Sequence, residues 1–146
     1  MVTLHGACIA LCETGILIRG SSGAGKSSLA LLLAAAADGA FVADDRVVCT
    51  VREGRLLACP HPSLAGRVEI RGQGILPVAE FGIPFRPEVV LDLAVDLVET
   101  APRLPEPPEA AALLGLTLPR LVLDRGVRAA GLAPLLIRAA LRKHRP

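Results

Sequence analysis

Residues 20–27 read Gly20-Ser21-Ser22-Gly23-Ala24-Gly25-Lys26-Ser27 and fit the pattern G-x-x-x-x-G-K-[ST] at every fixed position. In a loop of this kind, consecutive backbone N–H groups surround phosphate groups, the lysine adds a positive charge, and the final hydroxyl can bind Mg²⁺. The stretch therefore predicts a nucleotide-binding loop, with Lys26 beside the phosphates and Ser27 as a metal ligand.

The residues on either side of this loop have the patterns that a phosphate-binding loop needs. Residues 15–18 form a short apolar run typical of a buried strand. Residues 27–37 are rich in Leu and Ala, without proline or internal glycine, and end at Asp38-Gly39. This order of strand, loop and helix points the helix N-terminus at a bound phosphate. The alternative, a glycine-rich turn that meets the pattern by chance, does not explain the flanking strand and helix.

Strand patterns dominate the rest of the chain. A second helix is expected at residues 132–143, and the proline-rich residues 102–108 must form a loop. The turn of one hairpin is expected at Glu53-Gly54. Further strands are predicted at residues 2–10, 40–43, 46–51, 55–59, 68–70, 89–98 and 121–123. We therefore expect one α/β domain over residues 1–146, a P-loop nucleotide-binding domain around a mixed β-sheet with few helices.

Composition and charge narrow the class of protein. The 146 residues are 52% hydrophobic and 2% aromatic, which predicts a core of Leu, Val, Ile and Ala. The net charge of +2, without an interior basic block, does not favour nucleic acid as a partner. No apolar run is long enough to span a bilayer, and residues 1–19 lack the pattern of a secretory signal. The four cysteines form no C-x-x-C pair, so we expect reduced thiols in a cytoplasmic protein.

Two carboxylates stand where a nucleotide-dependent enzyme would use them. Asp44 follows the apolar run at residues 40–43, and Glu69 lies on the strand expected at residues 68–70. Carboxylates at strand ends can bind a metal or orient a nucleophile beside a phosphate loop. The alternatives are a turn or helix cap for Asp44-Asp45, a solvated strand position for Glu69, and a structural histidine at His5. The phosphate loop favours a functional role for Asp44.

Four segments in order then resemble a known family. They are His5-Gly6, the loop at residues 20–27, Val42-Ala43-Asp44-Asp45-Arg46-Val47, and Val68-Glu69-Ile70-Arg71-Gly72-Gln73-Gly74-Ile75. On these segments the chain resembles the catalytic domain of HPr kinase/phosphorylase, most of all a short form without the N-terminal domain. The likeness is dense over residues 3–78 and then thins to Pro102-Arg103-Leu104.

The resemblance implies a fold like that of phosphoenolpyruvate carboxykinase and a role for each matched residue. It implies that Asp44 takes the proton of the target serine and that His5 lies against Asp44 and tunes its protonation. It also implies that Lys26 neutralises phosphate charge and that Arg103 stabilises the charge on the transferring group. An aspartate with an ordinary pKa of about 3.9 is a weak base, so it would mainly orient the hydroxyl and accept the proton late.

The same resemblance implies the cofactors and partners. ATP and Mg²⁺ would be used, with Ser27 and Glu69 holding the metal. The substrate would be a serine on the small phosphocarrier protein HPr or a nitrogen-branch homologue, and the reverse activity would remove that phosphate with inorganic phosphate to give pyrophosphate. The family assembles as hexamers, so a homo-oligomer is expected.

The chain departs from the family before its last helix. At residues 123–132 only scattered Arg and Gly persist of the family's basic, proline-containing segment, which is linked to dephosphorylation. Kinase activity is therefore expected, whereas phosphorylase activity stays open. Two alternatives also stay open: a P-loop kinase of a small molecule, and a regulator that senses ATP without turnover. The presence of Asp44 and Glu69 argues against the regulator, because a pure sensor needs no base.

Overall fold

The computed structural model describes residues 1–144. The strands are β1 (Val2–His5), β2 (Ala7–Leu11), β3 (Thr14–Gly20), β4 (Gly39–Ala43), β5 (Arg46–Arg52), β6 (Arg55–Pro60), β7 (Arg67–Ile70), β8 (Gly74–Pro77), β9 (Val89–Leu97), β10 (Ala111–Leu113), β11 (Leu116–Leu118) and β12 (Arg120–Leu123). The helices are α1 (Lys26–Ala34), α2 (Arg125–Ala129) and α3 (Ala133–Lys143), with short 3-10 segments η1 (Pro62–Leu64) and η2 (Val78–Phe81).

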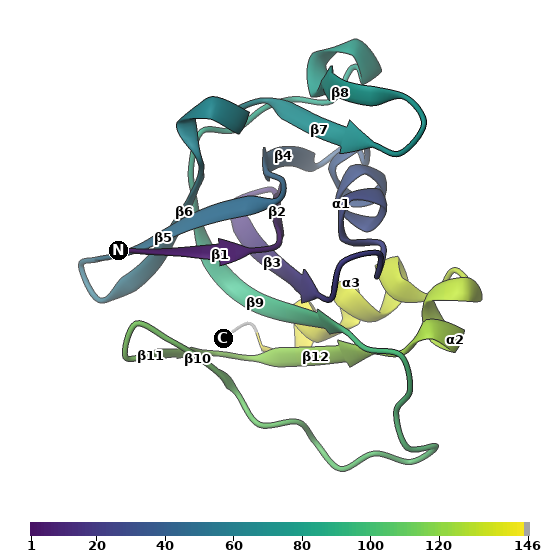
Figure 1. The fold of residues 1–146 in the computed structure, drawn as a ribbon. Coiled ribbons are helices and arrows are strands. Elements are labelled where there is room, and N and C mark those ends of the chain that lie inside the picture. Colours follow the sequence, from purple (N-terminus) through teal and green to yellow (C-terminus); the bar gives the residue numbers. More distant parts are fainter. Residues whose placement is uncertain (145–146) are drawn as a thin grey trace.

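Most of the strands form one mixed sheet. Its order is β1-β5-β6-β9-β3-β2-β4, and β12 also pairs with β9. Strands β3, β9 and β12 run parallel, so their carboxyl ends meet at one edge, whereas β2 is antiparallel to both β3 and β4. Hairpins β7–β8 and β10–β11 form two small separate sheets (Figure 1). The predicted mixed sheet with few helices is confirmed.

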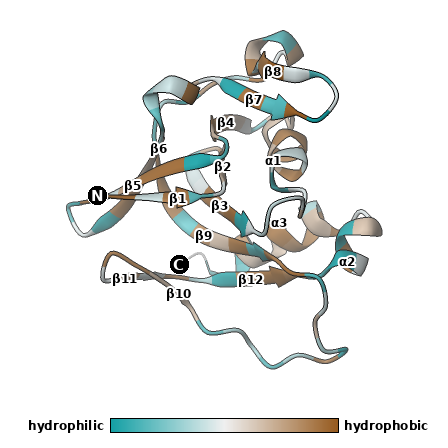
Figure 2. Cartoon of the chain, in the orientation of Figure 1, coloured by the Kyte–Doolittle hydropathy of each residue, from teal (hydrophilic) through white to brown (hydrophobic). Residues whose placement is uncertain are grey.

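Helices α1 and α3 cover one face of the sheet and enclose the first core (Figure 1). Figure 2 shows the hydrophobic residues along α1 and the central strands. The guanidinium of Arg138 on α3 donates two hydrogen bonds, of 2.9 and 3.0 Å, to the carboxylate of Asp38 after α1. This first core contains, among others, Ile9, Ile16, Ile18, Leu33, Phe41, Leu93, Val95 and Ile137.

A second core fills the other face of the sheet. Successive residues of a strand point to opposite faces, so Ile16 and Ile18 enter the first core while Leu17 enters the second. Its other members include Cys8, Val42, Val47, Cys49, Leu56, Ala94 and Leu118. Because both faces are buried, the central strands are continuous apolar runs rather than alternating ones, which is what residues 15–18 show.

Several predicted elements have different limits in the structure. The strand expected at residues 2–10 is two strands broken at Gly6, whose N–H donates to the carbonyl oxygen of Asp45 at 3.1 Å. A Cβ at Gly6 would lie 2.6 Å from the carbonyl oxygen of Ile18, so only glycine fits this crossing. The helix expected at residues 27–37 is α1, which ends three residues earlier, at Ala34.

Two further observations bear on the expectations from composition. Within residues 1–144, no helix is long and apolar enough to cross a membrane. The four cysteines are free thiols; Cys8 and Cys49 are buried, whereas Cys12 is exposed. Burial raises the pKa of Cys49 to about 11, so this thiol stays protonated at neutral pH.

Candidate functional site

The phosphate loop connects the carboxyl end of β3 to the first residue of α1, as the sequence predicts. Gly23 and Gly25 have φ angles of +82° and +93°, a left-handed conformation that favours glycine. A Cβ added at either residue would meet no atom within 4 Å, so the backbone here borders open space. Among residues 1–144, the N–H groups of Gly23, Gly25 and Lys26 donate to no protein acceptor. This backbone fits a bound phosphate group.

Lys26 is held against the loop that it belongs to. Its side chain is largely buried, with 8% of the residue exposed. Its Nζ donates to the carbonyl oxygens of Gly20 and Ser21, both at 2.9 Å. The ammonium group is therefore anchored at the first two residues of the loop, and a lysine there can add positive charge beside phosphate oxygens.

Asp44 joins the phosphate loop to β4 and β7. It follows the last residue of β4 and is 6% exposed. The hydroxyl of Ser27 donates to its Oδ1 at 2.6 Å, and the N–H of Glu69 approaches its Oδ2 at 3.4 Å. The structure thus brings together three segments that are distant in the sequence, and it places a carboxylate against the hydroxyl predicted to bind metal.

Glu69 lies on the hairpin β7–β8, which packs on α1 (Figure 1). The alternation of the strand buries Val68 and leaves the Glu69 side chain exposed. Within residues 1–144, no group of three or more His, Cys, Asp and Glu side chains could hold a metal ion. The available donors are the Ser27 hydroxyl and carboxylates, which are hard oxygen ligands. Such a set suits Mg²⁺, which binds through one or two carboxylates and substrate phosphates.

His5 does not lie against Asp44, so this expectation is wrong. The Nδ1 of His5 is 3.4 Å from Oδ1 of Asp45, and both side chains are more than half exposed. The cause is the backbone: β1 pairs with β5 so that His5 lies opposite Arg46, next to Asp45. Asp45 has a φ of +66°, a left-handed backbone conformation, directly after the buried Asp44.

The structure does not bring Arg103 to the phosphate loop. Arg103 is exposed in the connection between β9 and β10, which extends away from the sheet (Figure 1). Among residues 1–144 it makes no hydrogen bond or ion pair. That connection does begin beside the loop, because Gly20 and Leu97 are paired where β3 and β9 end.

One group of charges beside the site was not predicted from the sequence. Arg19, the residue before the loop, donates to both carboxylate oxygens of Asp96, at 2.7 and 2.9 Å. Arg120 on β12 donates to Asp96 as well, at 2.5 Å. Burial alone would raise the pKa of Asp96, but the hydrogen bonds from the two arginines outweigh it and hold this pKa below its usual range. The Asp96 carboxylate on β9 therefore links β9 to both of its parallel neighbours, β3 through Arg19 and β12 through Arg120.

We expect Asp96→Asn to lower the free energy of unfolding at pH 7 by about 2 kcal/mol, since it removes charged hydrogen bonds in a partly buried site. A lowered pKa in the folded state stabilises the protein above the unfolded value of about 3.9, and this contribution is lost as the pH falls through the folded value. Urea unfolding at several pH values should show that the free energies of unfolding of the wild type and the variant converge as the pH falls below about 4.

The matched control is Glu99→Gln, which removes the exposed ion pair with Arg125 (3.0 Å). An exposed pair contributes little, so this control should not change stability measurably. A constant difference between Asp96→Asn and the wild type down to pH 3 would contradict the expected role of the carboxylate charge.

Comparison with known proteins shows the family of this chain. Residues 1–145 match the family described as HPr Serine kinase C-terminal domain. A protein of Azoarcus sp. (strain BH72) named HPr kinase/phosphorylase is 38% identical over 154 residues, which is 97% of this chain and 47% of that protein. A protein of the same name from Mycoplasma mycoides is 36% identical over 97 residues, 65% of this chain and 31% of that protein.

The fold also matches a solved structure, the Hpr(Ser) kinase/phosphatase from Coxiella burnetii. The TM-score is 0.80 at 26% sequence identity, over 99% of this chain and 90% of that chain. The chain thus spans about half, or less, of the length of these two named relatives.

Proposed function

The chain belongs to the HPr serine kinase C-terminal domain family, and from this membership we propose that it transfers the γ-phosphoryl group of ATP to a serine of a small phosphocarrier protein. The acceptor is HPr or a nitrogen-branch homologue. The observation that supports this most is the contact of Ser27 with Asp44 at 2.6 Å, which joins the phosphate loop to a buried carboxylate.

The loop and its neighbours bind the nucleotide in this proposal. The free N–H groups of residues 23, 25 and 26 bind phosphate oxygens, and Lys26 adds its charge. Ser27 and Glu69 would hold Mg²⁺, and Asp44 orients the Ser27 hydroxyl through the contact at 2.6 Å. When bound, Mg²⁺ neutralises charge on the β- and γ-phosphate oxygens.

Asp44 also serves as the base. It orients the hydroxyl of the acceptor serine and takes its proton as that oxygen bonds to the phosphorus, while ADP leaves with the electrons of the broken bond. Its Oδ2 has only the long 3.4 Å contact with the N–H of Glu69, which leaves lone pairs for the proton. Asp44 lies against the phosphate loop, whereas Asp45 is turned toward His5, and this difference favours Asp44.

His5 and Arg103 take supporting roles. His5 acts on the site through Asp45, because that is the side chain it contacts. Arg103 stabilises the charge on the phosphoryl group in transfer, once the connection between β9 and β10 has closed over the phosphate loop. This connection follows Leu97, which pairs with Gly20 at the start of the loop. Whether the reverse phosphorolysis occurs depends on residues 123–132, of which Arg125–Ala129 form the short helix α2.

We expect Glu69→Gln to raise the concentration of Mg²⁺ needed for half-maximal transfer at least about tenfold, because even groups that only hydrogen-bond a metal ligand contribute about 10- to 100-fold to metal affinity. The measurement is the initial rate of transfer against free Mg²⁺ at saturating ATP. Glu80→Gln, an exposed glutamate in η2, is the control that should leave the requirement unchanged. An unchanged requirement in Glu69→Gln would remove this residue from the metal site.

The proposal and its two alternatives differ in when ADP forms. ADP release would be measured by a coupled assay with the protein and MgATP alone, with purified phosphocarrier protein, and with a mixture of small metabolites. ADP formed only with the phosphocarrier supports the protein kinase. ADP formed only with the metabolites supports a small-molecule kinase, and binding of ATP without ADP in any mixture supports a sensor.

We also propose that the protein forms a homo-oligomer, a hexamer by family resemblance. Apolar side chains are exposed on the outer faces of α1 and α3, including Leu32 at 69% and Leu135 at 67%. Exposed apolar patches often mark surfaces that bind another protein, which here would be a second copy of the chain. Light scattering coupled to gel filtration measures the mass directly, and a monomeric mass at all concentrations would contradict the proposal.

A further inference from the structure

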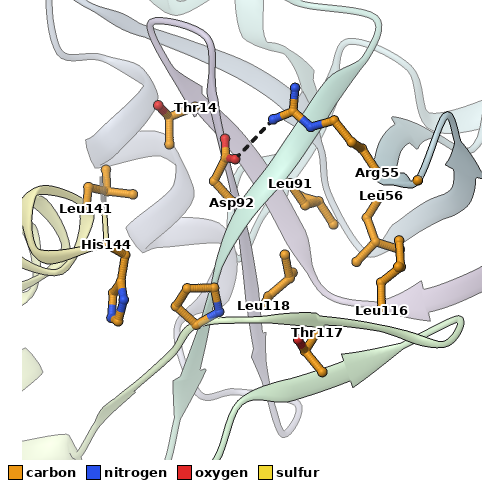
Figure 3. Close-up of a pocket in the computed structure, with 12 residues that line it drawn as sticks. Thr14, Arg55, Leu56, Leu91, Asp92, Leu116, Thr117, Leu118, Leu141 and His144 are labelled. Atoms are coloured by element: carbon orange, nitrogen blue, oxygen red, sulfur yellow. Dashed lines mark hydrogen bonds and ion pairs between the residues drawn. The ribbon is translucent and has the colours of Figure 1, made fainter. Parts of the chain in front are cut away.

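Figure 3 shows a cavity of about 490 Å³. It lies at the start of β3, at the end of the sheet opposite to the phosphate loop. Thr14, the first residue of β3, lines it, whereas the loop follows the last residue of the same strand, about 20 Å away at the rise of a strand. The other walls come from the turn between β5 and β6, from β9, from the hairpin β10–β11 and from the end of α3. The cavity is therefore separate from the proposed catalytic site.

A β-bulge directs a carboxylate into this cavity. Gly15 pairs with Leu91 and Ile16 pairs with Leu93, so Asp92 between them has no partner in the ladder of β3 and β9. Its Oδ2 lies 3.4 Å from the N–H of Gly15. A Cβ at Gly15 would lie 2.3 Å from the carbonyl oxygen of Val90, so the bulge needs glycine there. Bulges of this kind redirect a side chain, and they are frequent beside functional sites.

An arginine faces this carboxylate but does not satisfy it. The Nη2 of Arg55 is 3.5 Å from Oδ1 of Asp92, a long contact between side chains that are 63% and 37% exposed. Among residues 1–144 this is the one ion pair of Arg55, so most of its N–H groups remain available. Figure 3 shows Arg55 and Asp92 on one side of the cavity, with the hydroxyls of Thr14 and Thr117 and the ring of His144 around it.

The rest of the wall is apolar. Leu56, Leu91, Leu118 and Leu141 line the cavity, and each is at most 7% exposed. A cavity of this volume is in the range that binds small molecules, for which a few polar groups fix the orientation and an apolar wall accepts the rest.

We propose that this cavity binds a free α-amino acid with an aliphatic side chain. An anion alone would be repelled by Asp92 and a cation alone by Arg55, whereas a zwitterion offers a carboxylate to the guanidinium and an ammonium group to the carboxylate. In an α-amino acid both charges are attached to one carbon, which suits two protein charges that are neighbours. The aliphatic side chain would lie on the leucine wall.

The test is a ¹H–¹⁵N NMR titration of the labelled full chain, without nucleotide, with L-leucine, L-valine and L-isoleucine up to about 10 mM, which detects millimolar affinity. We expect saturable shifts at the amides of Gly15, Gly54 and Thr117 with at least one of the three. 4-Methylpentanoate and 3-methylbutylamine, each with one of the two charges of leucine, should bind at least about tenfold more weakly, since each loses a charged hydrogen bond. The titration requires no kinase activity, so its failure is distinct from that of the proposed function.

Variants separate the charges from the rest of the cavity. Arg55→Gln and Asp92→Asn should each weaken binding by about tenfold or more. Arg67→Gln, another exposed arginine at the first residue of a strand, should not. Because Arg55 is exposed, its variant should fold even where Asp92→Asn does not. Absence of shifts with all three amino acids, equal binding of the one-charge analogues, or unchanged binding in Arg55→Gln would each overturn the proposal.

Discussion

Replacing Lys26 by methionine is expected to lower kcat/KM for phosphoryl transfer by at least about a thousandfold, because a positioned cation on the transferring phosphate is worth this much. Methionine keeps an unbranched apolar chain in a site that is 8% exposed, so the fold is maintained. It removes the Nζ that donates to the carbonyl oxygens of Gly20 and Ser21. The measurement is the steady-state rate of ADP release together with ATP affinity from calorimetry.

The chain provides its own control for this change. Lys143, the other lysine of the sequence, lies at the last residue of α3, and Lys143→Met changes the net charge by the same amount. The control should keep the wild-type rate. Equal rates in Lys26→Met and the wild type would mean that the phosphate loop does not carry the reaction.

Asp44→Asn is expected to lower kcat by about 10²- to 10⁴-fold, the range for loss of a general base. ATP affinity should remain close to that of the wild type, because an asparagine oxygen can still accept the hydrogen bond from Ser27. Single-turnover transfer measured beside equilibrium binding of ATP separates the two quantities.

Asp45→Asn is the comparison that decides between the two neighbouring aspartates. Asp45 is exposed and lies 3.4 Å from His5, so its variant should retain more activity than Asp44→Asn. If Asp45→Asn loses transfer and Asp44→Asn does not, the base is Asp45 and Asp44 only orients Ser27. Equal loss of binding and transfer in Asp44→Asn would remove its assignment as base.

The parts of the fold that were predicted correctly are those determined locally. The loop between β3 and α1 follows from eight consecutive residues, and the hairpin of β5 and β6 follows from Glu53-Gly54, whose φ angles of +53° and +75° fit a tight turn. The break at Gly6 could not be seen, because it results from contact with Ile18 and Asp45 elsewhere in the sheet.

Strand β7 was predicted at residues 68–70, whereas β8, the hairpin β10–β11 and the helix α2 were missed, for different reasons. Strands β8, β10 and β11 have only three or four residues each, and neither alternation nor a bounded apolar run set them apart in the sequence. The turn of one hairpin, Leu114-Gly115, has positive φ angles. Helix α2 has five residues, too few for periodicity. Its one local signal was Asp124, whose side chain accepts from the N–H of Val127 at 2.8 Å as an N-cap.

In the site, too, local motifs could be predicted from the sequence, whereas contacts between distant segments could not. The family resemblance implied that Ser27, Asp44 and Glu69 belong to one site; in the structure the Ser27 hydroxyl contacts Asp44, and the backbone N–H of Glu69 lies 3.4 Å from it. The neighbour of His5 depended on strand register, which the sequence did not reveal. The contact between Arg19 and Asp96 joins residues 77 apart in the chain, so no local pattern indicates it.

The intact mass of the phosphocarrier protein tests the central proposal most directly. Purified phosphocarrier would be incubated with MgATP and either the wild type or Asp44→Asn, weighed by mass spectrometry, and fragmented to locate the modified residue. We predict one added phosphoryl group on a serine with the wild type and almost none with Asp44→Asn. ATP binding by the wild type without any mass gain on HPr or its nitrogen-branch homologue would contradict the assignment as a protein-serine kinase.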